Sequence, residues 1–250
     1  MKRFFITLSY NGKNYVGWQI QPNGVSVQQV LQEALSTILR EQTDVVGAGR
    51  TDAGVHARRM TAHFDFSGES FHEKDLVKNL NSFLPRDIAV HQIREVQPDA
   101  HARFSATSRT YKYYLTTEKD PFFHDFSYQV FFRPDIGKMN ALCEALKEYT
   151  DFTSFSKLHT DVKTNNCRVS EAYWEQESNT RFVFTITADR FLRNMVRAIV
   201  GTLLEAGRGR LDERGLRRII EAKDRRVAGD SAPGHALFLH DVVYPDNIWL

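Results

Sequence analysis

The chain runs twice through a similar succession of strands and helices, and this repetition limits the folds that are open to it. Runs rich in aromatic and β-branched residues predict strands, and apolar residues at helical spacing predict helices. Strands are predicted at residues 4–10, 61–66, 87–96, 108–117, 127–132, 169–176, 181–188 and 236–244. Helices are predicted at residues 26–38, 71–84, 135–149, 190–206 and 212–222. Strands mixed with helices in two similar halves indicate an α+β fold with a mixed sheet.

The polar connection at residues 97–106 ends the first half, and the pattern begins again after it. We therefore divide the chain into an N-terminal half, residues 1–105, and a C-terminal half, residues 106–250. A chain of 250 residues is long enough for one large domain or two smaller ones with a core in each.

Several classes of protein do not fit this sequence. The N-terminus enters a strand pattern directly, without the apolar run of a signal peptide. No apolar run approaches the roughly 18 residues that a membrane span needs. Cys143 and Cys167 form neither a metal-ligand spacing nor a disulfide framework. We therefore expect a cytoplasmic protein.

Charge points weakly toward a polyanionic partner. The net charge of +2 is too small to predict one, but arginine and lysine gather between residues 190 and 226. A basic face there would suit phosphates. A solvated helical surface with internal ion pairs explains the same charges, so composition leaves both interpretations open.

Residues 47–57, GAGRTDAGVHA, concentrate glycines with Arg50, Asp52 and His56 between a helix and a strand. Glycine lets the backbone adopt positive φ or approach a ligand closely. A loop that needs this freedom and also carries Arg50 and Asp52 is a candidate site. A solvated turn would have much the same composition, so the pattern alone does not decide between them.

The chemistry of this loop can be narrowed by exclusion. Its glycine spacing lacks the strand–turn–helix context and the Gly-Lys-Ser of a nucleotide-binding loop. Asp52 and His56 have no matching cluster of metal ligands nearby. The sequence contains the serine, histidine and aspartate residues that a Ser-His-Asp triad would need, so this triad is not excluded, although no G-x-S-x-G turn occurs. An isolated carboxylate remains, and such a group acts as nucleophile or general base if cations keep it ionised.

Two further elements carry candidate side chains. In the predicted helix 190–206, Arg193 and Arg197 are four residues apart, so we expect them on one face beside an apolar stripe. They would bind an acid or a phosphate there, or extend to solvent. In the predicted strand 108–117, Tyr111 alternates with cationic residues, as in a surface that stacks single-stranded RNA bases. Sheet-core packing is the alternative for this tyrosine.

Taken in order, these segments resemble the tRNA pseudouridine synthase A family over nearly the full chain. The resemblance rests on residues 10–12, 17–21, 26–28, 47–57, 84–88, 104–106 and 191–201, with Asn81, Arg109, Tyr111 and Tyr113 as single positions. It implies a mixed central sheet made of two similar α/β halves flanked by helices, with the active cleft between the halves. It further implies a homodimer that needs no metal or cofactor.

The resemblance also implies the reaction and the roles of particular residues. The reaction is isomerisation of uridine to pseudouridine at positions 38, 39 and 40 in the anticodon stem-loop of tRNA. Asp52 matches the catalytic aspartate, and Arg197 matches the basic residue that pairs with it. Tyr111 matches the tyrosine that stacks on the target base, and Arg50 matches the arginine that helps to extrude that base. Arg193 is a further candidate for binding tRNA.

Two segments depart from the family pattern. In the block at residues 232–239, Gly234 and Ala236 stand in the reverse of the expected order, and Ser156 replaces a common cysteine. We expect neither segment to touch the catalytic residues. Three alternatives remain: a synthase for other RNA uridines, a non-catalytic RNA-binding module, and an aspartate-dependent hydrolase.

Overall fold

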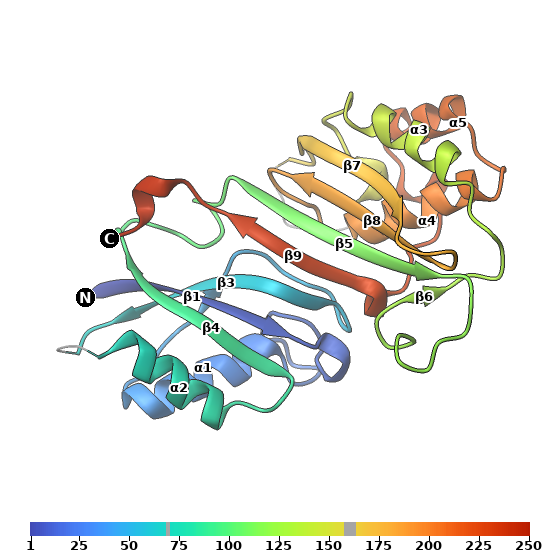
Figure 1. Cartoon of the computed structure of the whole chain (residues 1–250). Coiled ribbons are helices and arrows are strands. Elements are labelled where there is room, and N and C mark those ends of the chain that lie inside the picture. The colour runs from blue at the N-terminus through green and yellow to red at the C-terminus, as the bar shows by residue number, and fades with distance from the viewer. Residues whose placement is uncertain (69–70, 158–163) are drawn as a thin grey trace. The chain divides into compact units, whose positions relative to one another are not determined.

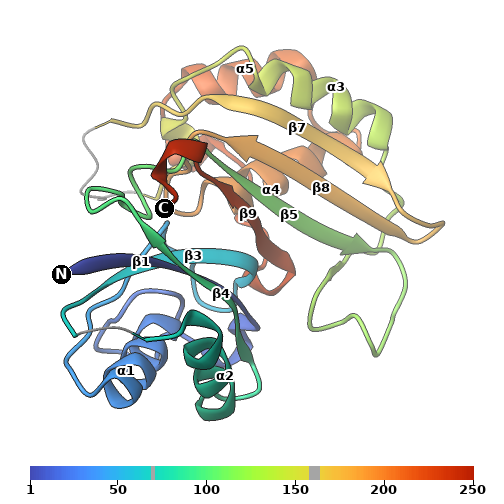
Figure 2. The ribbon, with the colours of Figure 1, turned by 60° about the vertical axis from the view of Figure 1, so that its left-hand side comes forward.

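The computed structural model describes residues 1–68, 71–157 and 164–250 (Figures 1 and 2). They form two compact units. The first unit contains Met1–Thr107 and Leu239–Leu250, and the second contains Ser108–Phe238. Within the described ranges, no helix combines the length and the apolar character needed to cross a bilayer.

The first unit is an antiparallel sheet covered by two helices. Its elements are β1 (Lys2–Tyr10), α1 (Val27–Leu39), β2 (Val46–Gly47), β3 (His56–Phe66), α2 (Glu73–Phe83) and β4 (Ile88–Val96). β1 pairs with both β3 and β4, and β2 pairs with β3. Figures 1 and 2 show α1 and α2 together on one face of this sheet. Fully buried side chains at its core include Ile6, Leu8, Leu31, Leu35 and Leu80.

The second unit is built around β8. Its elements are β5 (Ser108–Thr116), β6 (Tyr128–Gln129), α3 (Ile136–Leu146), β7 (Val169–Gln176), β8 (Arg181–Ala188), α4 (Met195–Gly207) and α5 (Glu213–Glu221). β8 pairs antiparallel with β5 and β7, whereas β6 pairs parallel with β5. α3 packs against β7 and contacts α4 and α5. Buried aromatic rings, among them Tyr113, Phe182 and Phe184, fill the core.

The predicted α+β fold with a mixed sheet and two similar halves is confirmed. Each half runs through a strand, a helix, an antiparallel strand pair, a helix and a strand. In the first half these are β1, α1, β2–β3, α2 and β4. In the second they are β5, α3, β7–β8, α4 and, after α5, β9 (Leu237–Val243). Ser26 caps the N-terminus of α1, because its Oγ accepts the Gln29 N–H at 3.2 Å.

The last residues of the chain belong to a different unit from the one that the division at residue 105 gave them. That division placed everything after it in the C-terminal half, whereas Leu239–Leu250 groups with the first unit. Aromatic packing accounts for this, since the rings of Tyr244 and Trp249 meet the ring of Phe5 edge-on at 5.0 and 5.7 Å. The segment returns to cover the start of β1.

A partly buried polar cluster lies near this end of β1. Arg3 donates from Nε and Nη2 to the two carboxylate oxygens of Asp65 at 2.7 and 2.8 Å. His63 accepts the Ala102 N–H at Nδ1 (3.1 Å), and its ring lies 4.6 Å from that of His101. Burial is the main cause that lowers the pKa of His63 to about 4, and the charges of His101 and Arg3 act in the same direction.

We predict that the free energy of unfolding falls as the pH drops from 6.5 toward 4. His63 stays neutral in the folded protein across this window but takes up a proton when the chain unfolds, so acid favours the unfolded state. The loss should be about 2–3 kcal/mol. In His63→Asn the amide oxygen can still accept the Ala102 N–H, and the pH dependence should be clearly smaller. Urea unfolding at pH 7, 5.5 and 4.5 measures it. The exposed variant His91→Asn is the control, and an unchanged slope in His63→Asn would contradict the assignment.

Candidate functional site

Asp52 lies in the loop that joins β2 to β3, and the residue before it is fixed at two points. The Thr51 side chain is buried, and its hydroxyl shares a hydrogen bond of 2.8 Å with the hydroxyl of Tyr10. The Thr51 carbonyl accepts the Trp18 N–H at 3.2 Å. Asp52 itself is partly exposed, and Arg50 is exposed. The predicted loop therefore holds its carboxylate next to a fixed residue.

The loop turns immediately after Asp52. The Asp52 carbonyl accepts the Val55 N–H at 3.1 Å, and Gly54 has a φ of 75°. This arrangement matches a type II β-turn, which requires positive φ at its third residue and therefore favours glycine. The Gly54 N–H also donates to the carbonyl of Tyr15 at 3.4 Å. The turn directs the chain from Asp52 straight into β3.

His56 gains a role that the sequence did not reveal. The side chain is buried, and its Nδ1 accepts the Gly12 N–H at 3.0 Å. With Nδ1 as acceptor, the neutral ring carries its proton on Nε2. A Cβ on Gly12 would lie 2.0 Å from the Val55 carbonyl oxygen, so only glycine allows the two segments to lie this close. His56 therefore closes the far end of the loop onto the segment after β1.

The three glycines predicted to shape the loop do not contribute equally. Gly54 supplies positive φ, and Gly47 makes room for the indole of Trp18, whose Nε1 would lie 2.4 Å from an added Cβ. Gly49 does neither: an added Cβ would meet no heavy atom within 4 Å, and its φ is not positive. Nothing in the structure requires glycine at position 49.

Tyr111 lies on β5 in the second unit, in register with Ile186 of β8. Its ring meets Phe191 edge-on, with the centroids 5.0 Å apart. The side chain is partly exposed, unlike that of Tyr113, which is fully buried on the same strand. The strand and the ring contact therefore hold Tyr111 in one orientation with part of its surface accessible.

Arg193 and Arg197 do not share a helical face, and this prediction was wrong. α4 begins at Met195 and not at residue 190, because Asn194 has a left-handed backbone with a φ of 69°. Arg193 therefore lies in the turn before the helix, where its side chain is exposed and its carbonyl accepts the Lys157 N–H. Arg197 lies within the first turn of α4 and is partly buried. The apolar stripe of the predicted helix is buried as expected.

The block at residues 232–239 does touch a predicted catalytic residue, which corrects the expectation that it would not. Nε of Arg197 donates to the Ala232 carbonyl at 2.7 Å, and the Ala232 N–H donates back to the Arg197 carbonyl at 3.0 Å. The Tyr113 hydroxyl donates to the Pro233 carbonyl at 3.0 Å. This segment therefore orients the guanidinium of Arg197.

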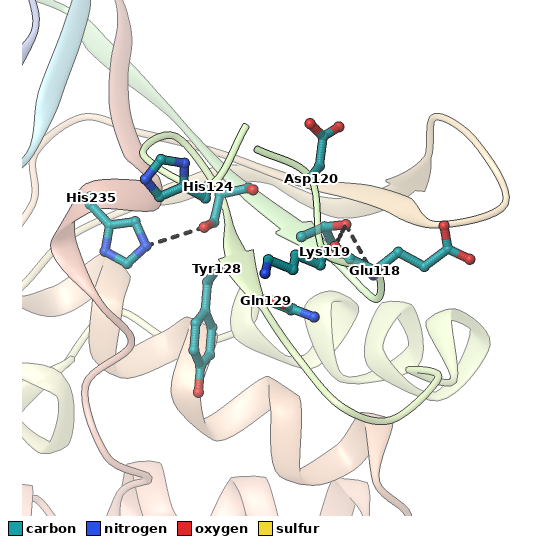
Figure 3. A pocket seen from close by; sticks show the side chains of 9 residues that line it. Glu118, Lys119, Asp120, His124, Tyr128, Gln129 and His235 are labelled. Atoms are coloured by element: carbon teal, nitrogen blue, oxygen red, sulfur yellow. Dashed lines mark hydrogen bonds between the residues drawn. The ribbon is translucent and has the colours of Figure 1, made fainter. Parts of the chain in front are cut away.

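A pocket of about 230 Å³ opens beside β6 in the second unit (Figure 3). Its lining mixes acids, bases and hydroxyls: Thr116, Glu118, Lys119, Asp120, His124, Ser127, Tyr128, Gln129 and His235. The ring of His235 bonds through Nε2 to the Ser127 carbonyl at 3.1 Å. The lining does not include any of the predicted site residues, which are Arg50, Asp52, Tyr111, Arg193 and Arg197. The first two lie in the first unit and the other three in the second.

Several residues that contact the surroundings of Asp52 and Arg197 were not predicted as functional from the sequence. Tyr10, Gly12 and Trp18 contact the loop around Asp52, but in the sequence they stand out only as part of the family resemblance. Ser231 likewise accepts a hydrogen bond from the Asn194 amide at 2.6 Å, just before α4. These partners are distant in sequence, so no local spacing points to them.

Comparison with known proteins gives one consistent result. A sequence profile described as tRNA pseudouridine synthase matches residues 6–105 and 145–245. A protein from Parabacteroides distasonis named tRNA pseudouridine synthase A is 61% identical, covering 100% of this chain and 98% of that protein. Proteins of the same name from Porphyromonas gingivalis and Exiguobacterium sibiricum are 56% and 36% identical. Those matches cover 100% and 99% of this chain and 100% and 98% of the relatives.

We predict that Gly201→Ala destabilises the protein, although alanine is the better helix former. A Cβ on Gly201 in α4 would lie 1.7 Å from the Asp230 carbonyl oxygen, so residues 230–232 must move. The free energy of unfolding should fall by about 1–3 kcal/mol. Gly137→Ala in α3 is the matched control, since its Cβ would meet only a carboxylate oxygen at 3.4 Å. It should be neutral or stabilising by up to about 1 kcal/mol. Equal stability of the two variants in urea unfolding would contradict the account.

Proposed function

Because the chain belongs to the tRNA pseudouridine synthase family, we propose that it converts uridine to pseudouridine at positions 38, 39 and 40 of the tRNA anticodon stem-loop. The protein is an isomerase. One observation carries the proposal: relatives matched over nearly their full length, one of them 61% identical, bear the name tRNA pseudouridine synthase A. The geometry adds support, because Asp52 lies on a loop held at both ends.

The reaction rearranges bonds within one nucleotide. The bond between C1′ and N1 breaks, the uracil rotates, and C1′ bonds to C5. C5 loses its hydrogen as a proton and N1 takes one up, so the product is an isomer of the substrate. The target base must first leave its stack, at a cost of about a few kcal/mol. Contacts between cationic side chains and tRNA phosphates would offset this cost and weaken as salt rises.

Asp52 is the proposed catalytic residue, and its carboxylate has two possible first steps. It either attacks C1′, so that N1 leaves, or removes the proton from C2′. Both steps require the ionised carboxylate. Arg197 is proposed to favour that form as its ion-pair partner. The Arg197–Ala232 hydrogen bond supports this role, because it restricts the guanidinium before any substrate binds.

Three further residues are proposed to handle the substrate. The part-exposed ring of Tyr111, braced by Phe191, suits stacking on the extruded uracil. Arg50, exposed two residues before Asp52, is proposed to help extrude the base. Arg193, exposed before α4, is proposed to bind a phosphate. We also propose, from the family resemblance, that the protein acts as a homodimer in the cytoplasm without a metal or cofactor.

We predict that Asp52→Asn abolishes pseudouridine formation in a tRNA transcript and leaves tRNA binding intact. Asparagine keeps the shape of the side chain but can neither attack C1′ nor accept a proton, so turnover should fall by roughly 10³-fold or more. Nucleoside analysis of the digested transcript measures turnover, and a filter assay measures binding. Asp44→Asn, which removes an exposed carboxylate elsewhere in the first unit, is the control. Substantial pseudouridine from Asp52→Asn would rule out its catalytic role.

The same assay on the wild-type protein tests the alternative functions. Release of free uracil would favour a hydrolase, and an unchanged transcript would favour a binding module.

Arg197→Lys should reduce kcat by about tenfold to a hundredfold, since lysine keeps the charge but loses the planar guanidinium. The Nε donor that bonds to Ala232 would be lost, and with it the fixed orientation. Single-turnover kinetics on the same transcript measures the change. Arg210→Lys, at an exposed arginine beyond α4, is the matched control. A wild-type rate in Arg197→Lys would mean that charge alone suffices.

A further inference from the structure

We propose that residues 10–18 position Asp52 for catalysis, and that the hydroxyl pair of Tyr10 and Thr51 is the main contact by which they do so. The inference rests on the proposed function, since it assigns a role relative to the Asp52 carboxylate. Tyr10 and Thr51 are positioning residues and do not touch the substrate. Each contact that supports the proposal lies within the first unit.

The hydroxyl pair is buried and joins two different elements. Tyr10 is the last residue of β1 and is 4% exposed, while Thr51 is 7% exposed. Their oxygens lie 2.8 Å apart. The register between β1 and β3 shifts between Leu8 and Tyr10, and Tyr10 pairs with Ala57 of β3 beyond this shift. The ring of Trp18 packs near the Tyr10 ring, with centroids 6.1 Å apart, and helps to hold it.

A second contact fixes the backbone of the same residue. The Thr51 carbonyl accepts the Trp18 N–H, and the preceding residue, Gly17, has a φ of 115°. A Cβ on Gly17 would lie 2.4 Å from the Thr51 carbonyl oxygen. The approach is therefore possible only with glycine. Thr51 is held by its side chain and by its backbone, so the direction of the next residue's side chain is restricted.

The other side of Asp52 is held by the same nine-residue segment. Tyr15 accepts the Gly54 N–H, and Gly12 donates to His56. The Tyr15 hydroxyl donates to the Asp87 carboxylate at 2.6 Å, which anchors the segment in turn. Asp52 thus lies between two fixed points, Thr51 and the turn at Gly54. A side chain held in this way needs little reorganisation to reach its reactive position.

A substitution at Thr51 can distinguish a role in positioning Asp52 from a role in stability alone. Thr51→Val keeps the shape of the side chain and removes its hydroxyl, leaving the Tyr10 hydroxyl buried without this partner. The carboxylate should then move by a fraction of an ångström, and a displacement of about 1 Å costs on the order of a hundredfold in rate. Substrate contacts elsewhere are unaffected. The expected effect is a lower kcat, by about tenfold to a hundredfold, with an unchanged KM.

The test compares kcat and KM on a tRNA transcript for five proteins: wild type, Thr51→Val, Thr51→Ser, Tyr10→Phe, and the double variant of Tyr10→Phe with Thr51→Val. Thr51→Ser retains the hydroxyl and should recover most of the wild-type kcat. The double variant should be no slower than the slower single variant, because both changes remove the same bond. Tyr10→Phe removes one oxygen atom and serves even if Thr51→Val folds poorly.

Matched controls come from the same unit. Thr43→Val removes the hydroxyl of a buried residue that donates to the Glu41 carbonyl, and Tyr244→Phe removes the hydroxyl of a partly buried residue that donates to the Ala102 carbonyl. Both should lower Tm without changing kcat. A merely structural role for Tyr10 and Thr51 predicts the same behaviour for their variants.

Two results would overturn the proposal: a wild-type kcat in folded Thr51→Val and Tyr10→Phe, or an equal loss in Thr51→Ser and Thr51→Val. If Asp52→Asn is inactive in the same assay, either result leaves the catalytic aspartate in place and removes only the positioning role. A wild-type protein that forms no pseudouridine would overturn the positioning proposal and the proposed function together.

Discussion

The hydrogen bond between the Tyr10 and Thr51 hydroxyls links the end of the first strand to the loop that carries Asp52. Around it, the backbone groups of Gly12, Tyr15 and Trp18 each bond to one residue of that loop or to His56. A loop of this kind has no ladder of its own, so buried polar groups must find partners in a neighbouring segment. The segment at residues 10–18 supplies them, and the position of the carboxylate depends on it.

The second unit uses a similar solution for Arg197. A segment outside the helices and strands, residues 230–233, lies against the first turns of α4, and its Ala232 carbonyl accepts Nε of Arg197. Gly201 makes this close approach possible, since any side chain there would collide with the Asp230 carbonyl. In each unit, a glycine thus lets an irregular segment lie against a functional one. The proposed catalytic groups owe their geometry to irregular backbone supported by the sheets.

The sequence predicted the fold class, the order of the α-helices and of the strands other than β2, and the loop around Asp52, because periodicity and glycine content are local signals. It missed the start of α4, since the left-handed Asn194 follows from tertiary contacts such as its bond to Ser231 and interrupts an otherwise helical pattern. It left His56 without a role for a related reason: its partner, Gly12, lies 44 residues away. The packing of Tyr244 and Trp249 on Phe5 is equally non-local.

The most direct test of the account is a position-resolved map of pseudouridine in an unmodified tRNA transcript after incubation with the wild-type protein. The transcript should carry uridine at positions 38, 39 and 40, and a second transcript should carry cytidine at all three. We predict pseudouridine at those positions in the first transcript and none in the second. Pseudouridine elsewhere in the tRNA, or in both transcripts alike, would contradict the proposed substrate site. Its complete absence would contradict the proposed reaction.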